Sequence, residues 1–188
     1  MFVYIQKELN INGVKLRKYE VGIEKGREGN RSLVEFAALS DAVQIVSEDL
    51  QVFEPSETGD AFEKKICNRC NRLLPIAMFT KNQNGKNNRS VRRPSCNDCR
   101  RLIDGTAVSA KDKREWEKTK PENIFWVCPI CKKKTIPGLT SKVVLDHDHQ
   151  TGKPNEWICD SCNTGLGRFN DDISVMEEAI HYLKKHKK

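Results

Sequence analysis

Residues 146–149 read DHDH, so Asp146 and Asp148 alternate with His147 and His149, which are two of only four histidines in the chain. An imidazole with its ordinary pKa of ~6.5 can accept a proton near neutral pH, and carboxylate oxygens are ligands for hard cations. A CxxC pair begins ten residues after His149. We infer that a cysteine-bound metal serves as a scaffold here, and that the DHDH cluster belongs to a second, oxygen-rich site.

All eight cysteines fall in four CxxC pairs. Two such thiolate pairs can complete one tetrahedral Zn²⁺ site with Zn–S distances of ~2.3 Å. The spacing leaves open which pairs combine, but joining nearest neighbours closes the shortest loops and is favoured on that ground. A redox role for the CPIC pair alone would not explain four pairs. We therefore predict two structural zinc ions per chain, held by Cys67, Cys70, Cys96 and Cys99 and by Cys128, Cys131, Cys159 and Cys162.

The composition indicates a cytoplasmic protein. The 188 residues are 37% hydrophobic and 31% charged, and no apolar run approaches the ~18 residues of a membrane-spanning helix, so no membrane partner is expected. The first residues, MFVYIQKELN, lack the basic start and apolar stretch of a secretory signal. Because a reducing compartment disfavours disulfides, the cytoplasmic assignment agrees with cysteines that bind metal.

The net charge of +7 is unevenly distributed along the chain. Residues 1–60 contain 7 basic and 11 acidic residues, whereas residues 61–188 contain 26 basic and 15 acidic residues. The cysteine-bearing part is therefore the basic part. This asymmetry favours a polyanionic partner for that part, with a solvated basic surface as the alternative.

Three regions follow one another along the chain. Residues 1–60 read as a mainly β N-terminal region suited to DNA recognition or dimer contacts, although LSDAVQIVSEDLQVF within it is compatible with helix or strand. Residues 61–120 are expected to form a four-cysteine zinc ribbon with a basic loop and a charged connecting helix that Pro121 ends. Residues 121–188 are expected to form the catalytic domain, with the second four-cysteine zinc site.

The catalytic domain is expected to contain a hairpin followed by two helices. VVLDHDH reads as a strand, TGK as a turn, EWIC as a second strand, and DSCNTGLGRF as a helix with Asp160 as its cap. An amphipathic helix follows, with Asp171 or Asp172 as its cap. Its apolar stripe is expected to pack against the rest of the chain, and it comprises Met176, Ala179, Ile180 and Leu183.

The motifs CPIC, LDHDH and ICDSCNTGLGRFNDD resemble those of the ββα-metal nucleases, also called His-Me finger or HNH-like nucleases, and among them the group of phage endonuclease VII. The resemblance covers residues 125–186, and the unit at 67–99 is similar to the zinc ribbon that often precedes this domain. It implies an α+β fold of small zinc-stabilised domains, in which a ββα-metal finger catalytic unit follows a zinc ribbon and a mainly β N-terminal region.

The resemblance also implies catalytic roles. Asp146 and Asn163 supply oxygen ligands to one Mg²⁺, for which Mn²⁺ can substitute, and His147 is the general base. His149 either holds the loop or acts directly in catalysis, and Asp148 is a hydrogen-bond partner. In a regular strand Asp146 and His147 would face opposite sides. The backbone must therefore leave β geometry at these two residues, or His147 is not the base.

A basic stretch lies within the first zinc unit. Residues 81–101 contain seven basic residues and one acidic residue, with Asn and Gln among them. Lys and Arg can hold phosphates, while Arg, Asn and Gln can read base edges in a groove. We predict DNA contacts from Arg89, Arg92 and Arg93, and the alternative is a solvated loop on a structural ribbon.

Three functions compete. The preferred one is a type II restriction enzyme, a sequence-specific endonuclease that cuts double-stranded DNA as a homodimer, because the N-terminal region and a complete ribbon suit recognition. The second is a phage-type Holliday-junction resolvase or a free-standing HNH-like nuclease. The third is a non-catalytic zinc-ribbon DNA-binding protein, which the intact Asp146, His147 and Asn163 disfavour.

Overall fold

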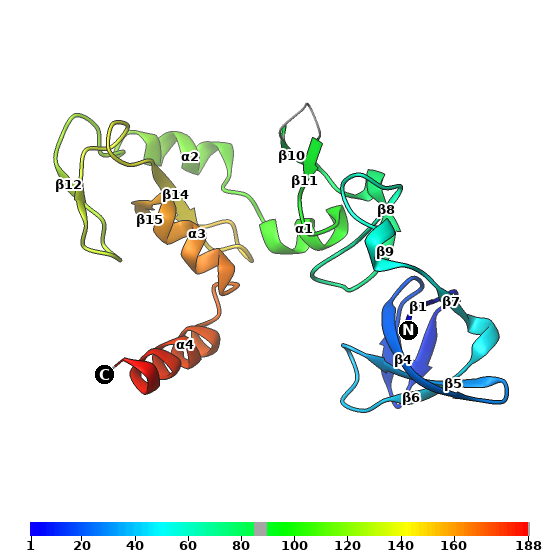
Figure 1. The fold of residues 1–188 in the computed structure, drawn as a ribbon. Helices are drawn as coiled ribbons and strands as arrows, with labels where there is room; N and C mark the ends of the chain where they lie inside the picture. Colours follow the sequence, from blue (N-terminus) through cyan, green and yellow to red (C-terminus); the bar gives the residue numbers. More distant parts are fainter. Residues whose placement is uncertain (85–89, 188) are drawn as a thin grey trace. The chain divides into compact units, whose positions relative to one another are not determined.

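The structure is a computed structural model that describes residues 1–84 and 90–187 (Figure 1). It divides into two compact units, Met1–Leu102 and Ile103–Lys188. Strands and helices occur together, so the predicted α+β class is confirmed. The finer division at residues 60 and 120 stays a prediction. Among the helices of the described ranges, none has the length and apolar character needed to cross a membrane.

The N-terminal region forms a five-stranded antiparallel sheet in the order β6-β5-β4-β1-β7, together with the hairpin β2-β3. Side chains alternate between the two faces of a strand, so Val3 and Ile5 of β1 and Val34 and Phe36 of β5 enter one core. The ambiguous stretch LSDAVQIVSEDLQVF contains the two edge strands of this sheet. The elements are β1 (Phe2–Ile5), β2 (Leu9–Ile11), β3 (Val14–Leu16), β4 (Val21–Glu28), β5 (Arg31–Phe36), β6 (Val43–Val46), η1 (Ser47–Asp49), β7 (Leu50–Val52) and η2 (Pro55–Glu57).

The first zinc unit follows within the first compact unit. Cys67 and Cys70 lie in the turn of the β8-β9 hairpin, and Cys96 and Cys99 lie where α1 begins. The polar stretch before Cys96, for which the sequence predicts a basic loop, contains the antiparallel strand pair β10-β11, and residues 85–89 between these strands lie outside the described residues. The elements are β8 (Lys64–Ile66), β9 (Leu73–Pro75), η3 (Ile76–Met78), β10 (Lys81–Asn84), β11 (Ser90–Arg92) and α1 (Asn97–Asp104).

The second zinc unit repeats this order of elements. Two hairpins and two helices occur first as β8-β9, β10-β11, α1 and α2, and then as β12-β13, β14-β15, α3 and α4. Each CxxC pair occupies the equivalent place in both series. The strands are too short for the repeat to show in the sequence beyond the doubled cysteine pattern. The remaining elements are α2 (Ala110–Glu117), β12 (Trp126–Val127), β13 (Lys134–Thr135), β14 (Val143–His147), β15 (Pro154–Cys159), α3 (Asp160–Arg168) and α4 (Ile173–His186).

The charged helix α2 ends as the sequence predicts, and the structure adds the cap at its start. The hydroxyl of Ser109 caps it by accepting a hydrogen bond from the Asp112 backbone N–H at 3.0 Å. The helix ends before Pro121, which cannot donate a backbone hydrogen bond to continue it. Just beyond the helix, the Thr119 hydroxyl accepts a hydrogen bond from Trp157 Nε1 at 3.3 Å, which joins this segment to β15.

The predicted caps of α3 and α4 have different outcomes. Asp172 caps α4, as one of the two predicted candidates, by accepting a hydrogen bond from the Ser174 N–H at 2.8 Å. The prediction that Asp160 caps α3 is wrong, because Cys159 occupies the N-cap position. The Asp160 carboxylate instead lies 3.1 Å from Lys142 Nζ in an ion pair.

Helix α4 differs from the prediction in its packing. No residue of this helix is buried by the described part of the chain, and Ile180 and Leu183 are 51% and 48% exposed. The expectation that the whole stripe packs against the chain is therefore wrong. Asn170 and Asp171 have positive φ angles of 58° and 54° and turn the chain between α3 and α4. Figure 1 shows α4, in red, standing clear of the β14-β15 hairpin.

Candidate active site and metal centres

Each cysteine quartet forms one compact cluster, in which the four thiol sulfurs lie within 4.8 Å of one another. A tetrahedral ion with Zn–S distances of ~2.3 Å places its sulfur ligands ~3.8 Å apart. The Sγ–Sγ distance from Cys70 to Cys96 is 4.0 Å, and those from Cys128 to Cys162 and from Cys131 to Cys159 are 3.9 Å. The predicted nearest-neighbour pairing is confirmed, and both donor sets fit a zinc ion.

Backbone N–H groups favour the thiolate of one cysteine in each cluster. Burial opposes ionisation of Cys67, but backbone N–H groups, led by that of Cys96, outweigh it and lower the pKa of Cys67 to about 7. In the same way N–H groups, led by that of Cys159, overcome burial and lower the pKa of Cys128 to about 6. Burial and the neighbouring cysteines raise the pKa of Cys162 to about 12. A cation is therefore needed to hold four thiolates together.

The β14-β15 hairpin carries the DHDH residues, and its strand pairing is irregular there. β14 pairs antiparallel with β15 from Val143 to Leu145, but the register shifts between Leu145 and His147. The extra residue lies on β15, where Asn155 and Glu156 stand opposite Asp146, and β14 continues as a strand through His147. The departure from β geometry that the sequence analysis expects at Asp146 and His147 stays a prediction.

The side chains of Asp146 and His147 have different surroundings. Asn155 of β15 donates a hydrogen bond from Nδ2 to Asp146 Oδ2 at 2.9 Å and so orients the carboxylate. His147 Nε2 is buried and has no hydrogen-bond partner within residues 1–84 and 90–187. An unpaired buried polar atom is costly. We therefore expect a water or substrate atom to contact His147 Nε2 in the working protein.

Asp148 forms the turn at the tip of the hairpin. Its Oδ1 accepts hydrogen bonds from the backbone N–H groups of Thr151 at 2.8 Å and Gln150 at 2.7 Å. These bonds, that of Thr151 first, lower the pKa of the Asp148 carboxyl below its ordinary value. Asp148 is thus a hydrogen-bond partner that shapes the loop, in line with the sequence analysis.

His149 connects the hairpin tip to the end of α3. Its ring lies against the ring of His147, with 4.8 Å between the centroids. Its Nδ1 atom lies 3.4 Å from Oδ2 of Asp171, and both side chains are partly exposed. The left-handed backbone of Asn170 and Asp171 places this carboxylate near the imidazole. The arrangement restrains the His149 ring, which in turn lines one side of His147.

Residues 105–107, which we call the strap, hold the hairpin tip through its backbone. The Thr106 N–H donates to the His149 carbonyl at 2.7 Å, and the Thr106 hydroxyl donates to the Gln150 carbonyl at 3.0 Å. Gly105 has a φ of +58°, and a Cβ added there would overlap the His149 carbonyl. Glycine is therefore required where the strap passes this loop.

Asn163 comes from the third element of the site, helix α3, which contacts both β14 and β15. It directly follows the zinc-cluster residue Cys162, and its side chain is half-buried. The cysteine cluster fixes this helix next to the hairpin, because Cys159 ends β15 and Cys162 lies in the first turn of α3. The catalytic roles of Asp146, His147, His149 and Asn163 stay predictions.

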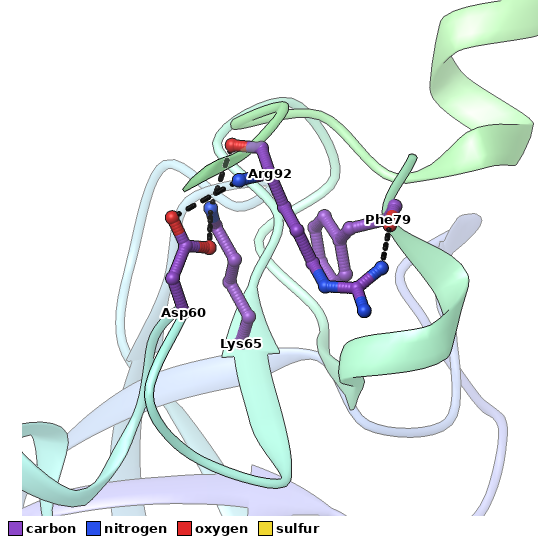
Figure 2. Close-up of polar contacts among 4 residues, drawn as sticks. All are labelled: Asp60, Lys65, Phe79 and Arg92. Atoms are coloured by element: carbon purple, nitrogen blue, oxygen red, sulfur yellow. Dashed lines mark hydrogen bonds and ion pairs between the residues drawn. The ribbon is translucent and has the colours of Figure 1, made fainter. Parts of the chain in front are cut away.

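The arginines predicted to contact DNA lie on and beside β11. Figure 2 shows Arg92 donating from its guanidinium to the Phe79 carbonyl at 2.7 Å, while its backbone N–H donates to Asp60 at 3.1 Å. Lys65 Nζ lies 2.6 Å from the same Asp60 carboxylate and donates to the Arg92 carbonyl at 3.2 Å. Arg92 therefore also has a structural role. Arg93 is half-buried, and Arg89 lies outside the described residues.

Sequence reasoning missed three residues of this site: Asn155, Asp171 and Gly105. The contact of Asn155 with Asp146 depends on the strand register, and the contact of Asp171 with His149 depends on the turn after α3. Gly105 lies in a segment whose path past the hairpin has no local signature. The one available signal was the second acidic residue in the NDD sequence, since only one of the two aspartates caps α4.

Comparison with known proteins shows the family to which the chain belongs. The model of the family described as recombination endonuclease VII matches residues 107–185, and that of the His-Me finger endonuclease beta4-alpha2 domain matches residues 56–105. The crystal structure of the beta-beta-alpha-Me type II restriction endonuclease Hpy99I matches with a TM-score of 0.88 and 38% sequence identity, over 99% of this chain and 97% of that chain. The chain belongs to the ββα-metal nucleases of the endonuclease VII group.

This ββα-metal nuclease also resembles a curated phage protein. It is 37% identical to the Gene 59 protein of Mycobacterium phage D29 over 59 residues, which are 31% of this chain and 34% of that protein. The alignment thus spans about a third of the phage protein's length. The name beta4-alpha2 agrees with the order of four strands and two helices that the ββα-metal nuclease contains twice.

Proposed function

We propose that this ββα-metal nuclease is a type II restriction enzyme, a sequence-specific endonuclease that hydrolyses double-stranded DNA. Its family and its similarity to Hpy99I over nearly the whole chain support a DNA endonuclease. The observation that carries the catalytic part is the buried Nε2 of His147, which has no hydrogen-bond partner among the described residues and lies at the end of β14, next to Asp146.

In the proposed reaction His147 is the general base. Its Nε2 accepts a proton from the water that attacks phosphorus, and the bond from phosphorus to the departing 3′ oxygen breaks. A histidine suits this step because its ordinary pKa of ~6.5 leaves it neutral at physiological pH. The contacts of His149 with the His147 ring and with Asp171 keep the base oriented.

Asp146 and Asn163 are proposed to hold one Mg²⁺, or Mn²⁺ in its place. A carboxylate and an amide oxygen are suitable ligands for a hard cation that keeps positions open for phosphate and water. When bound, the cation offsets the charge that develops on the phosphate and the departing oxygen. Asn155 holds the Asp146 carboxylate in one orientation, as outer partners of metal ligands commonly do.

Incubation with Mg²⁺ tests the proposed function on two substrates, a long linear duplex and a four-way junction. Discrete duplex fragments support a sequence-specific endonuclease. Cutting of the junction alone would favour the second candidate, a Holliday-junction resolvase. The match to the recombination endonuclease VII family supports this candidate. Absence of cutting on both substrates by zinc-loaded protein would refute nuclease activity.

The variant His147→Ala tests the general base. It should keep its zinc and its affinity for DNA while losing ~10²–10⁴-fold in cleavage rate. His181→Ala on the exposed face of α4 is the control and should cut normally. Near-normal turnover of His147→Ala would remove His147 from this role.

DNA contacts are proposed for Arg89, Arg92 and Arg93. Arg93→Ala is the cleaner test, because loss of the Arg92 side chain would also remove its hydrogen bond to Phe79. Removing one phosphate contact should weaken binding across sequences and reduce the salt dependence by about one counterion. An unchanged salt dependence in Arg93→Ala would exclude that residue as a phosphate contact.

We also propose a cytoplasmic location, since thiol clusters persist in a reducing compartment.

A homodimer is proposed because each chain provides one set of Asp146, His147 and Asn163. One such set acts on one strand at a time, whereas a two-fold dimer presents two sets to the two strands of a palindromic site. On a supercoiled plasmid the dimer should produce linear DNA without an accumulation of nicked circles.

A further inference from the structure

The second compact unit contains a cleft that gathers all three tryptophans of the chain. Its volume is about 690 Å³, which lies within the range of small-ligand sites. Trp116 comes from α2, Trp126 from β12 and Trp157 from β15. Pro121 and Ile124 add further apolar surface. We call this the tryptophan cleft.

The packing of the chain uses these indole rings only in part. Trp157 is 9% exposed, and its Nε1 donates a hydrogen bond to the Thr119 hydroxyl at 3.3 Å. Trp116 and Trp126 also line the cleft but are only half-buried. Because large aromatic side chains dominate the contact energy where they are covered, the uncovered surface of these two rings is available to a ligand.

Three consecutive residues of β15 line the same cleft. In a regular strand their side chains would alternate between the two faces, yet Asn155, Glu156 and Trp157 all take part. The bulge in β15 accounts for this, because its extra residue lies at Asn155 and Glu156 and a bulge re-aims side chains. The cleft therefore combines aromatic surface with an amide and a carboxylate.

Asn155 joins the tryptophan cleft to the candidate active site. Its Nδ2 donates one hydrogen bond to Asp146 Oδ2 at 2.9 Å, which leaves the second N–H and the carbonyl oxygen of the amide for a ligand. The carboxylate of Glu156 is exposed and makes no ion pair or hydrogen bond within the described ranges. Both polar groups can therefore contact a bound molecule without giving up a contact of the fold.

Two lysines give the cleft a means of holding phosphates. Lys118 and Lys120 line it and pair with Glu115 and Glu117 of α2 at 2.8 and 2.9 Å. Such surface ion pairs contribute little to stability, so either lysine can turn to a DNA phosphate instead.

We propose that the tryptophan cleft holds one unstacked base of a DNA strand that lies at the active site, and that this base carries an exocyclic amino group. The ligand class rests on the proposed function, which supplies DNA. Indole rings stack on every base, and the Glu156 carboxylate accepts a hydrogen bond from the amino group of cytosine or adenine. Thymine has no amino group and presents the O4 acceptor in its place.

A filled cleft also affects catalysis through Asn155. A base next to the Asn155 amide holds this side chain, which in turn holds the proposed metal ligand Asp146. A base in a duplex must first leave its stack, which costs free energy. We therefore expect single strands and unpaired bases to fill the cleft more readily than paired ones.

The first test uses the intrinsic fluorescence of the three tryptophans, which all line the cleft. Zinc-loaded protein is titrated without Mg²⁺, so that no strand is cut, with single strands of about 12 nucleotides that contain only cytosine, only thymine or only abasic residues. The phosphates are the same in all three. We expect the cytosine strand to quench the fluorescence and to bind ~10-fold more tightly than the thymine strand, because it adds a hydrogen bond to a charged group. The abasic strand should bind weakly and leave the fluorescence unchanged.

The second test replaces cleft residues and follows binding by the anisotropy of labelled strands. Trp116→Leu and Trp126→Leu should each weaken binding of the cytosine strand ~10-fold and leave that of the abasic strand unchanged. Phe125→Leu is the control, because Phe125 is 68% exposed and does not line the cleft. Glu156→Gln should bind the cytosine and thymine strands equally, because a glutamine amide can also donate to thymine O4. Two zinc ions per chain and an unchanged circular dichroism spectrum check that each variant is folded.

Quenching that does not depend on the bases, unaltered binding in both tryptophan variants, or a cytosine preference that survives in Glu156→Gln would each overturn the proposal. Quenching by a proline-rich peptide and by no strand would assign the cleft to a protein partner and overturn it equally. Binding without Mg²⁺ does not depend on cleavage, so these failures are separable from failure of the proposed function. If both hold, a substrate with an unpaired cytosine beside the cleaved bond should be cut faster than the fully paired duplex.

Discussion

Replacement of Gly105 by alanine should damage the catalytic unit through its contact with the His149 loop. Gly105 has a φ of +58°, and an added Cβ would overlap the His149 carbonyl oxygen and lie 2.8 Å from its carbonyl carbon. A left-handed residue other than glycine costs about 1–2 kcal/mol. Relief of the overlap would also stretch the 2.7 Å hydrogen bond from Thr106 N–H to the His149 carbonyl, which contributes about 1 kcal/mol. We expect unfolding to become easier by about 2–4 kcal/mol.

Gly138→Ala is the matched control for this experiment. Gly138 has a φ of +80°, but a Cβ there would meet nothing within 4 Å among the described residues, so the variant isolates the cost of the left-handed backbone. All three tryptophans lie in the second compact unit, so urea unfolding followed by tryptophan fluorescence reports on that unit.

Cleavage should separate the two glycine variants further. A displacement of ~1 Å in a catalytic loop can reduce the rate ~10²-fold, and only Gly105→Ala forces His149 to move. Equal unfolding free energies and equal cleavage rates in Gly105→Ala and Gly138→Ala would refute the reasoning about the strap.

Three further perturbations test other contacts of the catalytic unit and the zinc clusters. Asn155→Ala frees the Asp146 carboxylate and should raise the Mg²⁺ concentration for half-maximal cleavage ~10–100-fold; an unchanged Mg²⁺ titration would contradict this. Cys159→Ser should leave one zinc per chain by elemental analysis and should change the tryptophan fluorescence. Cys96→Ser should lose the other zinc with little change in fluorescence. Two zincs per chain in either variant would exclude the replaced cysteine as a ligand. Hydrogen bonds lower the pKa of the Asp148 carboxyl in the folded protein. The ionised carboxylate therefore stabilises the fold fully above its unfolded pKa of ~3.9, and this stabilisation is lost as the pH falls through the lower pKa of the folded protein. The difference in unfolding free energy between the unaltered protein and Asp148→Asn should therefore be full at pH 6 and shrink below about pH 4, and a difference that grows on acidification would show the opposite sign.

Element types could be predicted wherever a local pattern decides them. Alternating apolar residues in β1 and β5 specify one buried face, and Pro121 prevents α2 from extending past it. Asp160 shows the limit of such rules, because Cys159 takes the N-cap position of α3 and Asp160 pairs with Lys142 instead. A local rule places a cap only to within a residue or two, and Asp160 lies one position inside α3.

The sequence by itself determined which ligand types this protein offers. Four CxxC pairs provide thiol ligands for two tetrahedral sites, and DHDH with Asn163 is the set that we propose for phosphodiester hydrolysis. The cysteine prediction is confirmed because ligand type and short spacing are properties of the chain itself, and they hold whatever path the longer loops take.

Only the tertiary structure decided which distant groups meet. The register shift in β15 places Asn155 opposite Asp146, and the strap brings Gly105 against His149, 44 positions away in the sequence. The exposure of Ile180 likewise depends on how the chain turns between α3 and α4. Strand register and loop path result from many long-range contacts that are weak one by one, so no short sequence window encodes them.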